Sequence, residues 1–179
     1  MAVYTDVRFD DAQDLLQALG LGRLQDLQGI RSGIENTNYF ATTDQGHWVL
    51  TLFERLTREQ LPYYLGLMQH LAQRGIPVPS PQPDPAGGLL HTVAGKPAAV
   101  VTRLPGSHRM APDAGHCAQV GAMLARMHLA GQDCPVAQPH LRGLAWWHDT
   151  LPQVLPHVDA AVAELLRSEL AFQSQLAES

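Results

Sequence analysis

The sequence predicts an α+β fold, in which a five-stranded antiparallel sheet with one main helix precedes a mainly helical part. Five short segments are rich in β-branched and aromatic residues, glycine and proline separate them, and the apolar spacing becomes helical from Asp113 onward. The chain has 179 residues, of which 45% are hydrophobic, so it can bury a sizeable core. We expect two lobes, at residues 1–104 and 105–179.

The first lobe is expected to open with a short helix over "DDAQDLLQALG", whose leucines share one face and whose Gly20 can end it. Three strands follow, because "LQDLQGI" alternates leucine with polar residues, "NYFATT" is aromatic and β-branched, and "HWVLTLF" is an apolar run. Asp44-Gln45-Gly46 has the chemistry of a tight turn. These elements predict an antiparallel meander.

A main helix is predicted over "EQLPYYLGLMQHLAQRG", where apolar residues recur at helical spacing. Pro62 lies near its first turn and Gly75 follows its end. The next segment, "IPVPSPQPDPAGG", is too rich in proline for a helix and is expected to be extended. "LLHTVA" and "KPAAVVTRL", on either side of Gly95, then predict a second hairpin that completes the sheet.

The second lobe is predicted to contain a helix from Asp113 to Gly131, with an apolar stripe that faces a core. Cys117 lies on that stripe, so we expect Cys117 and Cys134 to be buried free thiols rather than a disulfide or redox pair. Proline interrupts "LAWWHDTLPQVL". A last helix is expected to run to the chain end, marked by Val158, Val162, Leu165, Leu166 and Leu170.

Charge and composition argue against several classes of function. The net charge is −5 and the basic residues are scattered, so we expect no nucleic-acid or anionic-membrane partner. The beginning of the sequence lacks a signal-peptide pattern and no apolar run reaches the roughly 18 residues of a membrane span, so a cytoplasmic protein is expected. The nine histidines do not form a helical zinc motif, and metal binding by His and Cys is not expected.

Five sequence blocks follow one another in a recognisable order: "GIRSGIENTNYF", "WVLTLFER", "LPYYLGLMQHLAQRGIPVPSP", "GKPAAVVTRLPG" and "HCAQVGAMLARMHLA". Over about residues 1–130, they resemble the homoserine kinases of the aminoglycoside phosphotransferase and choline kinase superfamily. The resemblance implies a protein-kinase-like fold and an ATP-dependent enzyme that phosphorylates the hydroxyl of L-homoserine for threonine biosynthesis. Another small-molecule hydroxyl kinase of the superfamily, or a non-catalytic nucleotide-binding module, remains an alternative.

The resemblance places ATP between the lobes, beneath the first hairpin. The phosphates would then be covered by the hairpin turn, where glycine permits close approach of the backbone and asparagine offers amide donors. The residues concerned are Gly33, Glu35, Asn36 and Asn38. Asparagine also favours turns without any ligand, so an ordinary polar hairpin tip is the alternative.

For the adenine ring, the resemblance implies an apolar ceiling formed by Ile30 and Val49. Both residues could equally be ordinary strand core. The adenine edge would be bound by backbone groups near Thr102 and Leu104, in the connector between the lobes.

Thr51 stands where a general kinase carries a lysine that holds two phosphates and pairs with a helix glutamate. The only lysine of the chain is Lys96, in another hairpin. In the homoserine kinase branch, threonine is what the resemblance leads us to expect. Phosphate charge must then be neutralised by metal, backbone amides or an arginine; Arg31 and Arg55 are near in sequence, although solvent-exposed arginine is the commoner role. Glu59 could stand near the usual helix glutamate, or simply be an acid at a helix N-terminus, where acids are favoured without any function.

The catalytic half of such a site is not expected in this chain. Kinases of the superfamily use a His-x-Asp loop with a later asparagine, and then a second aspartate for magnesium. Asn36 and Asn38 are the only asparagines, and the adjacent His148 and Asp149 are interpreted as a capping or surface pair. We therefore expect a fragment without catalytic or metal-binding residues, which is inactive by itself. Its intact parent is expected to use ATP and Mg²⁺.

Overall fold

A computed structural model describes residues 4–177. The chain divides into two compact units, residues 1–137 and 138–179. The first unit contains the sheet with the helices α1 (Phe9–Ala18), α2 (Leu61–Gln73) and α3 (Ala114–Gly131), and the second contains α4 (Leu144–Val154) and α5 (Ala160–Ala177). The expected lobe boundary at residue 104 stays a prediction, because α3 packs against α2 and is therefore grouped here with the sheet.

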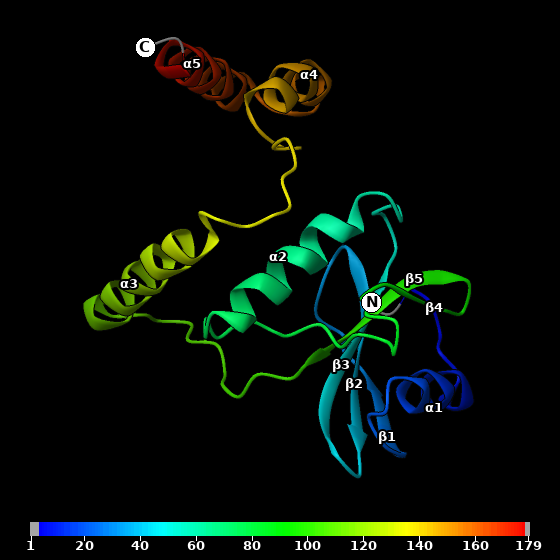
Figure 1. The fold of residues 1–179 in the computed structure, drawn as a ribbon. Helices are drawn as coiled ribbons and strands as arrows, with labels where there is room; N and C mark the ends of the chain where they lie inside the picture. Colours follow the sequence, from blue (N-terminus) through cyan, green and yellow to red (C-terminus); the bar gives the residue numbers. More distant parts are fainter. Residues whose placement is uncertain (1–3, 178–179) are drawn as a thin grey trace. The chain divides into compact units, whose positions relative to one another are not determined.

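The five-stranded antiparallel sheet confirms the predicted fold class (Figure 1). Its strands lie in the order β1-β2-β3-β5-β4. Their bounds are Leu24–Gly29 for β1, Asn36–Thr43 for β2, Gly46–Phe53 for β3, His91–Val93 for β4 and Lys96–Thr102 for β5. All the predicted strands form, and the second and third are joined by a tight turn at Asp44 and Gln45.

The hydrophobic core lies between the sheet and α1, Phe9–Ala18. Side chains of β2 alternate strictly between buried and half-buried, as expected for a strand with two different faces. The buried set faces α1, where Leu16, Leu50 and Val100 are fully enclosed. Gly20, with a φ of +69°, follows the end of α1 as predicted.

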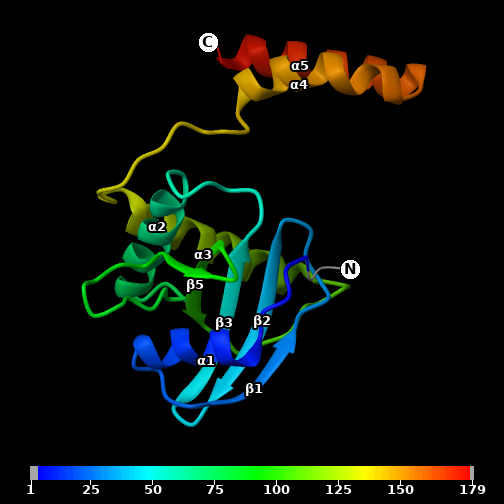
Figure 2. The same cartoon turned by 90° about the vertical axis from the view of Figure 1, so that its right-hand side faces the viewer.

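The main helix, α2, spans Leu61–Gln73 and lies on the opposite side of the sheet from α1 (Figures 1 and 2). Its leucines Leu61, Leu65 and Leu71 are buried. Pro62 occupies the first turn, where the missing N–H group has no helical partner to lose. Gly75, with a φ of +73°, follows the helix as predicted.

Helix α3, Ala114–Gly131, begins where the sequence predicts, because the Asp113 carboxylate accepts a hydrogen bond from the backbone N–H of His116 at 2.9 Å. The prediction that α3 faces a core is wrong for the described residues: no side chain of α3 is buried, and Val120 is 68% exposed. Among the described elements only α2 contacts α3 substantially, and Val120 and Leu124 of the apolar stripe are exposed. Cys117 is consequently exposed rather than buried.

The second unit consists of α4, Leu144–Val154, a short 3-10 turn at Leu155–His157, and α5, Ala160–Ala177. Pro152 lies in the last turn of α4 without interrupting it, which corrects the expectation of a broken segment. An apolar groove of about 280 Å³ runs between α4 and α5, lined in part by Trp146, Trp147 and Leu170. No helix in residues 4–177 has both the length and the apolar character of a membrane span.

Leu50 provides a test of the core assignment. Leu50→Ala should lower the free energy of unfolding by about 2–5 kcal/mol, because it leaves a cavity at a fully enclosed position. Leu124→Ala is the matched control, since Leu124 is 50% exposed on α3 and should change the value by less than about 1 kcal/mol. Urea unfolding followed by circular dichroism measures both. Equal losses in the two variants would contradict the assignment.

Candidate functional site

The face of the sheet that lies away from α1 brings several of the predicted site residues together. Asn38 pairs with Thr51, and Phe40 pairs with Val49, in the ladder between β2 and β3. The Ile30 N–H donates to the Asn38 carbonyl at 2.8 Å, which continues the β1–β2 register. Because side chains of directly opposed residues share a face, these residues form one continuous surface.

This surface is partly apolar and only half-buried at β2 and β3. Val49 pairs onward with Val101, and Thr51 pairs with Ala99 on β5. Ile30 and Val49 therefore lie on the same face, beside Ala99 and Val101 of β5, which are buried. Asn36 lies on this face too, opposite Phe53.

The Thr51 hydroxyl donates a hydrogen bond to Oδ1 of Asn38 at 2.8 Å. This bond uses the amide oxygen of Asn38 as acceptor and turns its NH₂ group, a donor, away from Thr51. The Nδ2 atom lies 3.5 Å from the Asn36 carbonyl oxygen. Thr51 thus orients an amide donor on this face and brings no positive charge of its own.

The turn between β1 and β2 depends on the conformation of Gly33, whose φ is +125°. A Cβ atom at this position would meet nothing closer than 3.8 Å, so backbone strain rather than lack of space selects glycine. Residues 31–34 of the turn are exposed and Glu35 is half-buried. The turn is open enough for a ligand to approach its backbone.

The connector after β5 carries an interaction that sequence reasoning missed. The Arg103 guanidinium lies over the ring of Phe40 at 3.9 Å, a cation–π contact. Alternation along "NYFATT" could have placed Phe40 beside Asn38, but the partner in the connector has no local signal. Thr102 is half-buried and its hydroxyl accepts from the Ser80 N–H at 2.9 Å, while Leu104 is exposed.

Lys96 does not supply the charge that Thr51 lacks. Its ammonium pairs with the Glu54 carboxylate at 3.1 Å. Glu54 also accepts from the buried Thr37 hydroxyl at 2.7 Å, on the face that α1 covers. Burial opposes ionisation of Glu54, but hydrogen bonds from Thr37, Thr5 and Lys96 outweigh it and hold its pKa below the ordinary 4.5.

The helix glutamate of general kinases has no counterpart within α2, since Leu61–Gln73 contains no acidic residue. Glu59 lies in the turn before α2, where it is exposed, and a hydrogen bond from Thr57 lowers its pKa. Arg31 and Arg55 are also exposed. The structure therefore brings neither half of the usual lysine–glutamate pair to this face.

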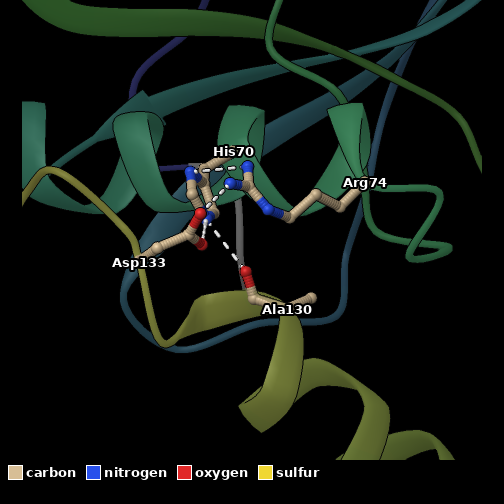
Figure 3. Close-up of polar contacts among 4 residues, drawn as sticks. All are labelled: His70, Arg74, Ala130 and Asp133. Carbon is tan, nitrogen blue, oxygen red and sulfur yellow. Dashed lines mark hydrogen bonds and ion pairs between the residues drawn. The ribbon is translucent and has the colours of Figure 1, made fainter.

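A second polar cluster, also missed from the sequence, joins the carboxyl end of α2 to the end of α3 (Figure 3). His70 is buried, and its Nε2 donates to the Ala130 carbonyl at 2.9 Å while Nδ1 accepts from Arg74 at 3.0 Å. Arg74 also pairs with Asp133 at 2.5 Å. The hydrogen bond from Arg74 holds the pKa of Asp133 below its ordinary value.

Residues 4–177 contain no group of three or more His, Cys, Asp or Glu side chains placed to hold a metal ion. His148 Nε2 lies 3.1 Å from the Ser174 hydroxyl, so it joins α4 to α5. The interpretation of His148 and Asp149 as a capping or surface pair stays a prediction.

Residues 26–179 match the family described as phosphotransferase enzymes. The chain belongs to this family. The five-stranded antiparallel sheet with one main helix is the fold that the sequence resemblance had implied.

Curated relatives are similar along the whole chain. A homoserine kinase of Polaromonas naphthalenivorans (strain CJ2) is 58% identical over 179 residues, which are 100% of this chain and 57% of the relative. A homoserine kinase of Cupriavidus necator is 55% identical, over 97% of this chain and 54% of the relative. Another from Janthinobacterium sp. (strain Marseille) is 52% identical, over 100% and 56%. The chain spans little more than half the length of these relatives.

Among solved structures, the fold is similar to spectinomycin phosphotransferase, crystallised in complex with ADP and spectinomycin. The TM-score is 0.60 at 14% sequence identity, and the match covers 97% of this chain and 55% of the other. The match confirms that this chain has the kinase-like fold of the phosphotransferases.

The Thr51–Asn38 hydrogen bond can be tested by removing the hydroxyl. Thr51→Val should lower the free energy of unfolding by about 0.5–1.5 kcal/mol, and Thr51→Ser should restore most of it. Thr42→Val is the control, because the Thr42 hydroxyl makes only an exposed 3.3 Å contact with His47 on the same face. If Thr42→Val and Thr51→Val are equally destabilising by urea unfolding, the bond contributes nothing specific.

Glu54 predicts a pH dependence of stability. Because its pKa is lower in the folded chain than the ordinary 4.5, its stabilising contribution is present above pH 4.5 and is lost as the pH falls through the folded pKa. Urea unfolding at a series of pH values should show a shallower acid loss for Glu54→Gln than for the unchanged chain. Superimposable profiles would contradict the prediction.

Proposed function

We propose that this chain is the ATP-clamping part of a homoserine kinase, which transfers the γ-phosphoryl group of ATP to the hydroxyl of L-homoserine to give O-phospho-L-homoserine. The sequence identity of 52–58% to curated homoserine kinases carries this proposal. The product is an intermediate on the route to threonine. The lobe division at residue 104 forms part of the proposal.

Nucleotide binding is supported by the chemistry of the sheet face that lies away from α1, here called the open face, whose side chains at β2 and β3 are mostly half-buried. Ile30 and Val49 offer an apolar surface for adenine, beside the small residues of β5. Backbone groups near Thr102 and Leu104, at the start of the connector, would bind the adenine edge. The bound ADP of spectinomycin phosphotransferase, a protein of the same fold, supports a nucleotide ligand.

Phosphate binding is assigned to the turn between β1 and β2. Gly33 lets the backbone approach the phosphates, and the amide groups of Asn36 and Asn38 act as donors, with Asn38 oriented by Thr51. Glu35, the last residue of the turn before β2, is assigned to the same phosphate-binding turn. Hydrogen-bond donors aimed at phosphate oxygens would position the γ-phosphoryl group and stabilise its charge.

Magnesium supplies charge neutralisation when it binds the phosphates of ATP in kinases. The residues described here do not form a carboxylate site for it. We therefore assign neither metal ligands nor a general base to this chain, and no detectable turnover is expected from it alone.

A chimaeric enzyme tests the proposal. The matching segment of the Polaromonas naphthalenivorans homoserine kinase, 57% of that protein, is replaced by this chain. The chimaera should release ADP from ATP in the presence of L-homoserine, whereas residues 1–179 alone should not. A folded chimaera that is indifferent to homoserine would overturn the proposed substrate.

Three further experiments test the phosphate-binding turn and the two alternatives. Gly33→Val in the chimaera should reduce kcat/KM at least about tenfold, because valine is strained at a φ of +125°. Choline and spectinomycin, offered as substrates, test the alternative of another small-molecule hydroxyl kinase. Calorimetry of residues 1–179 with ATP and magnesium tests the third alternative, a non-catalytic nucleotide-binding module.

A further inference from the structure

The segment Tyr4–Val7 crosses the α1 side of the sheet and is hydrogen-bonded to β2. The backbone N–H groups of Tyr4 and Thr5 donate to the Thr37 hydroxyl oxygen at 2.9 and 3.2 Å. The Val7 N–H donates to the Tyr39 hydroxyl at 3.1 Å, and that hydroxyl donates to the Thr5 carbonyl at 3.0 Å. The segment is therefore attached at two successive inward-facing residues of β2.

Thr37 is the centre of this attachment. Its side chain is fully buried, and its hydroxyl donates to Glu54 at 2.7 Å while accepting from Tyr4 and Thr5. One donor and two acceptor positions are all that a hydroxyl has, so Thr37 is saturated. The ion pair between Glu54 and Lys96 connects the same cluster to β5.

The segment also contacts the turn between β1 and β2. The ladder closes at Ile30, and beyond it the turn projects, with Ile34 79% exposed. The Tyr4 hydroxyl donates to the carbonyl of Ile34 at 3.3 Å. Tyr4 thus bonds to Thr37 through its backbone and to the turn through its side chain.

We propose that Tyr4–Val7 is a strap that holds the turn between β1 and β2 in position, with Thr37 as its attachment point. This proposal rests on the proposed function for its consequence: Thr37 lies between Asn36 and Asn38, whose side chains point to the opposite face. Bonds to the Thr37 side chain on the α1 face fix this part of β2, and they thereby hold the amide groups of Asn36 and Asn38 in place on the other face. Thr37 is thereby a positioning residue for the phosphates, without contact to the nucleotide.

Hydrogen exchange of the 179-residue chain, read by mass spectrometry, tests the strap. In Thr37→Val, exchange at the base of the turn, read at the Ile30 amide that donates to the Asn38 carbonyl, should be about five- to tenfold faster, and Thr37→Ser should restore slow exchange. Thr43→Val is the matched control: Thr43 is also buried on the α1 face of β2 and hydrogen-bonded, but it lies at the far end of the strand. Equal acceleration in both valine variants would overturn the proposal.

A second variant avoids any loss of folding. Tyr4→Phe removes only a hydroxyl from a side chain that is 56% exposed, and should accelerate exchange in the turn without changing the core. If hydrogen exchange in the turn is unchanged in both Tyr4→Phe and Thr37→Val, the strap proposal is wrong.

Calorimetric titration with ATP and magnesium separates the strap from its consequence. Thr37→Val should weaken ATP binding severalfold and Thr37→Ser should not. If Thr37→Val exchanges faster in the turn but binds ATP with unchanged affinity, the strap is supported and its role in nucleotide binding is contradicted. A chain that binds no ATP in its unchanged form would count against the proposed nucleotide site, while the exchange rates still decide the strap.

Discussion

The register between β2 and β3 is the constraint on which the rest of the first unit depends. It places Tyr39 opposite Leu50 on the α1 face and Asn38 opposite Thr51 on the open face. Side chains alternate along a strand, so a slip of one residue would move the leucines to the open face and the amide donors into the core. Core burial therefore stabilises the same register that assembles the candidate site.

The two faces of β2 differ in their polar groups: those on the α1 face are buried and contribute to stability, and those on the other face belong to the candidate site. Buried polar groups on the α1 face, Thr37 and Glu54 among them, are satisfied by one another and by the first described residues of the chain. The open face keeps its polar groups half-buried and oriented by short bonds. Thr51 and Lys96 show this difference, because the positive charge of Lys96 lies on the α1 face and the Thr51 hydroxyl lies on the face of the candidate site.

Much of this arrangement could be predicted from the sequence. The order of strands and helices, the end of α1 near Gly20 and the cap at Asp113 follow from local rules of turn and capping chemistry. Contacts between distant residues could not be predicted in this way: His70 with Ala130, Arg103 with Phe40, and Tyr4 with Thr37 have no local signature. The apolar stripe of α3 was correctly found, but periodicity does not reveal whether a partner covers it, and Cys117 is exposed as a result.

The position of the single lysine has a practical consequence for chemical labelling. Lys96 is 41% exposed at its side chain, so an amine-reactive probe can reach it, and apart from the amino terminus no other amine competes. Such a probe would be installed at one site, at the start of β5, next to the carboxylate of Glu54. Acylation would also remove the positive charge of Lys96. The same reaction would thus both report on the polar cluster beneath α1 and weaken it.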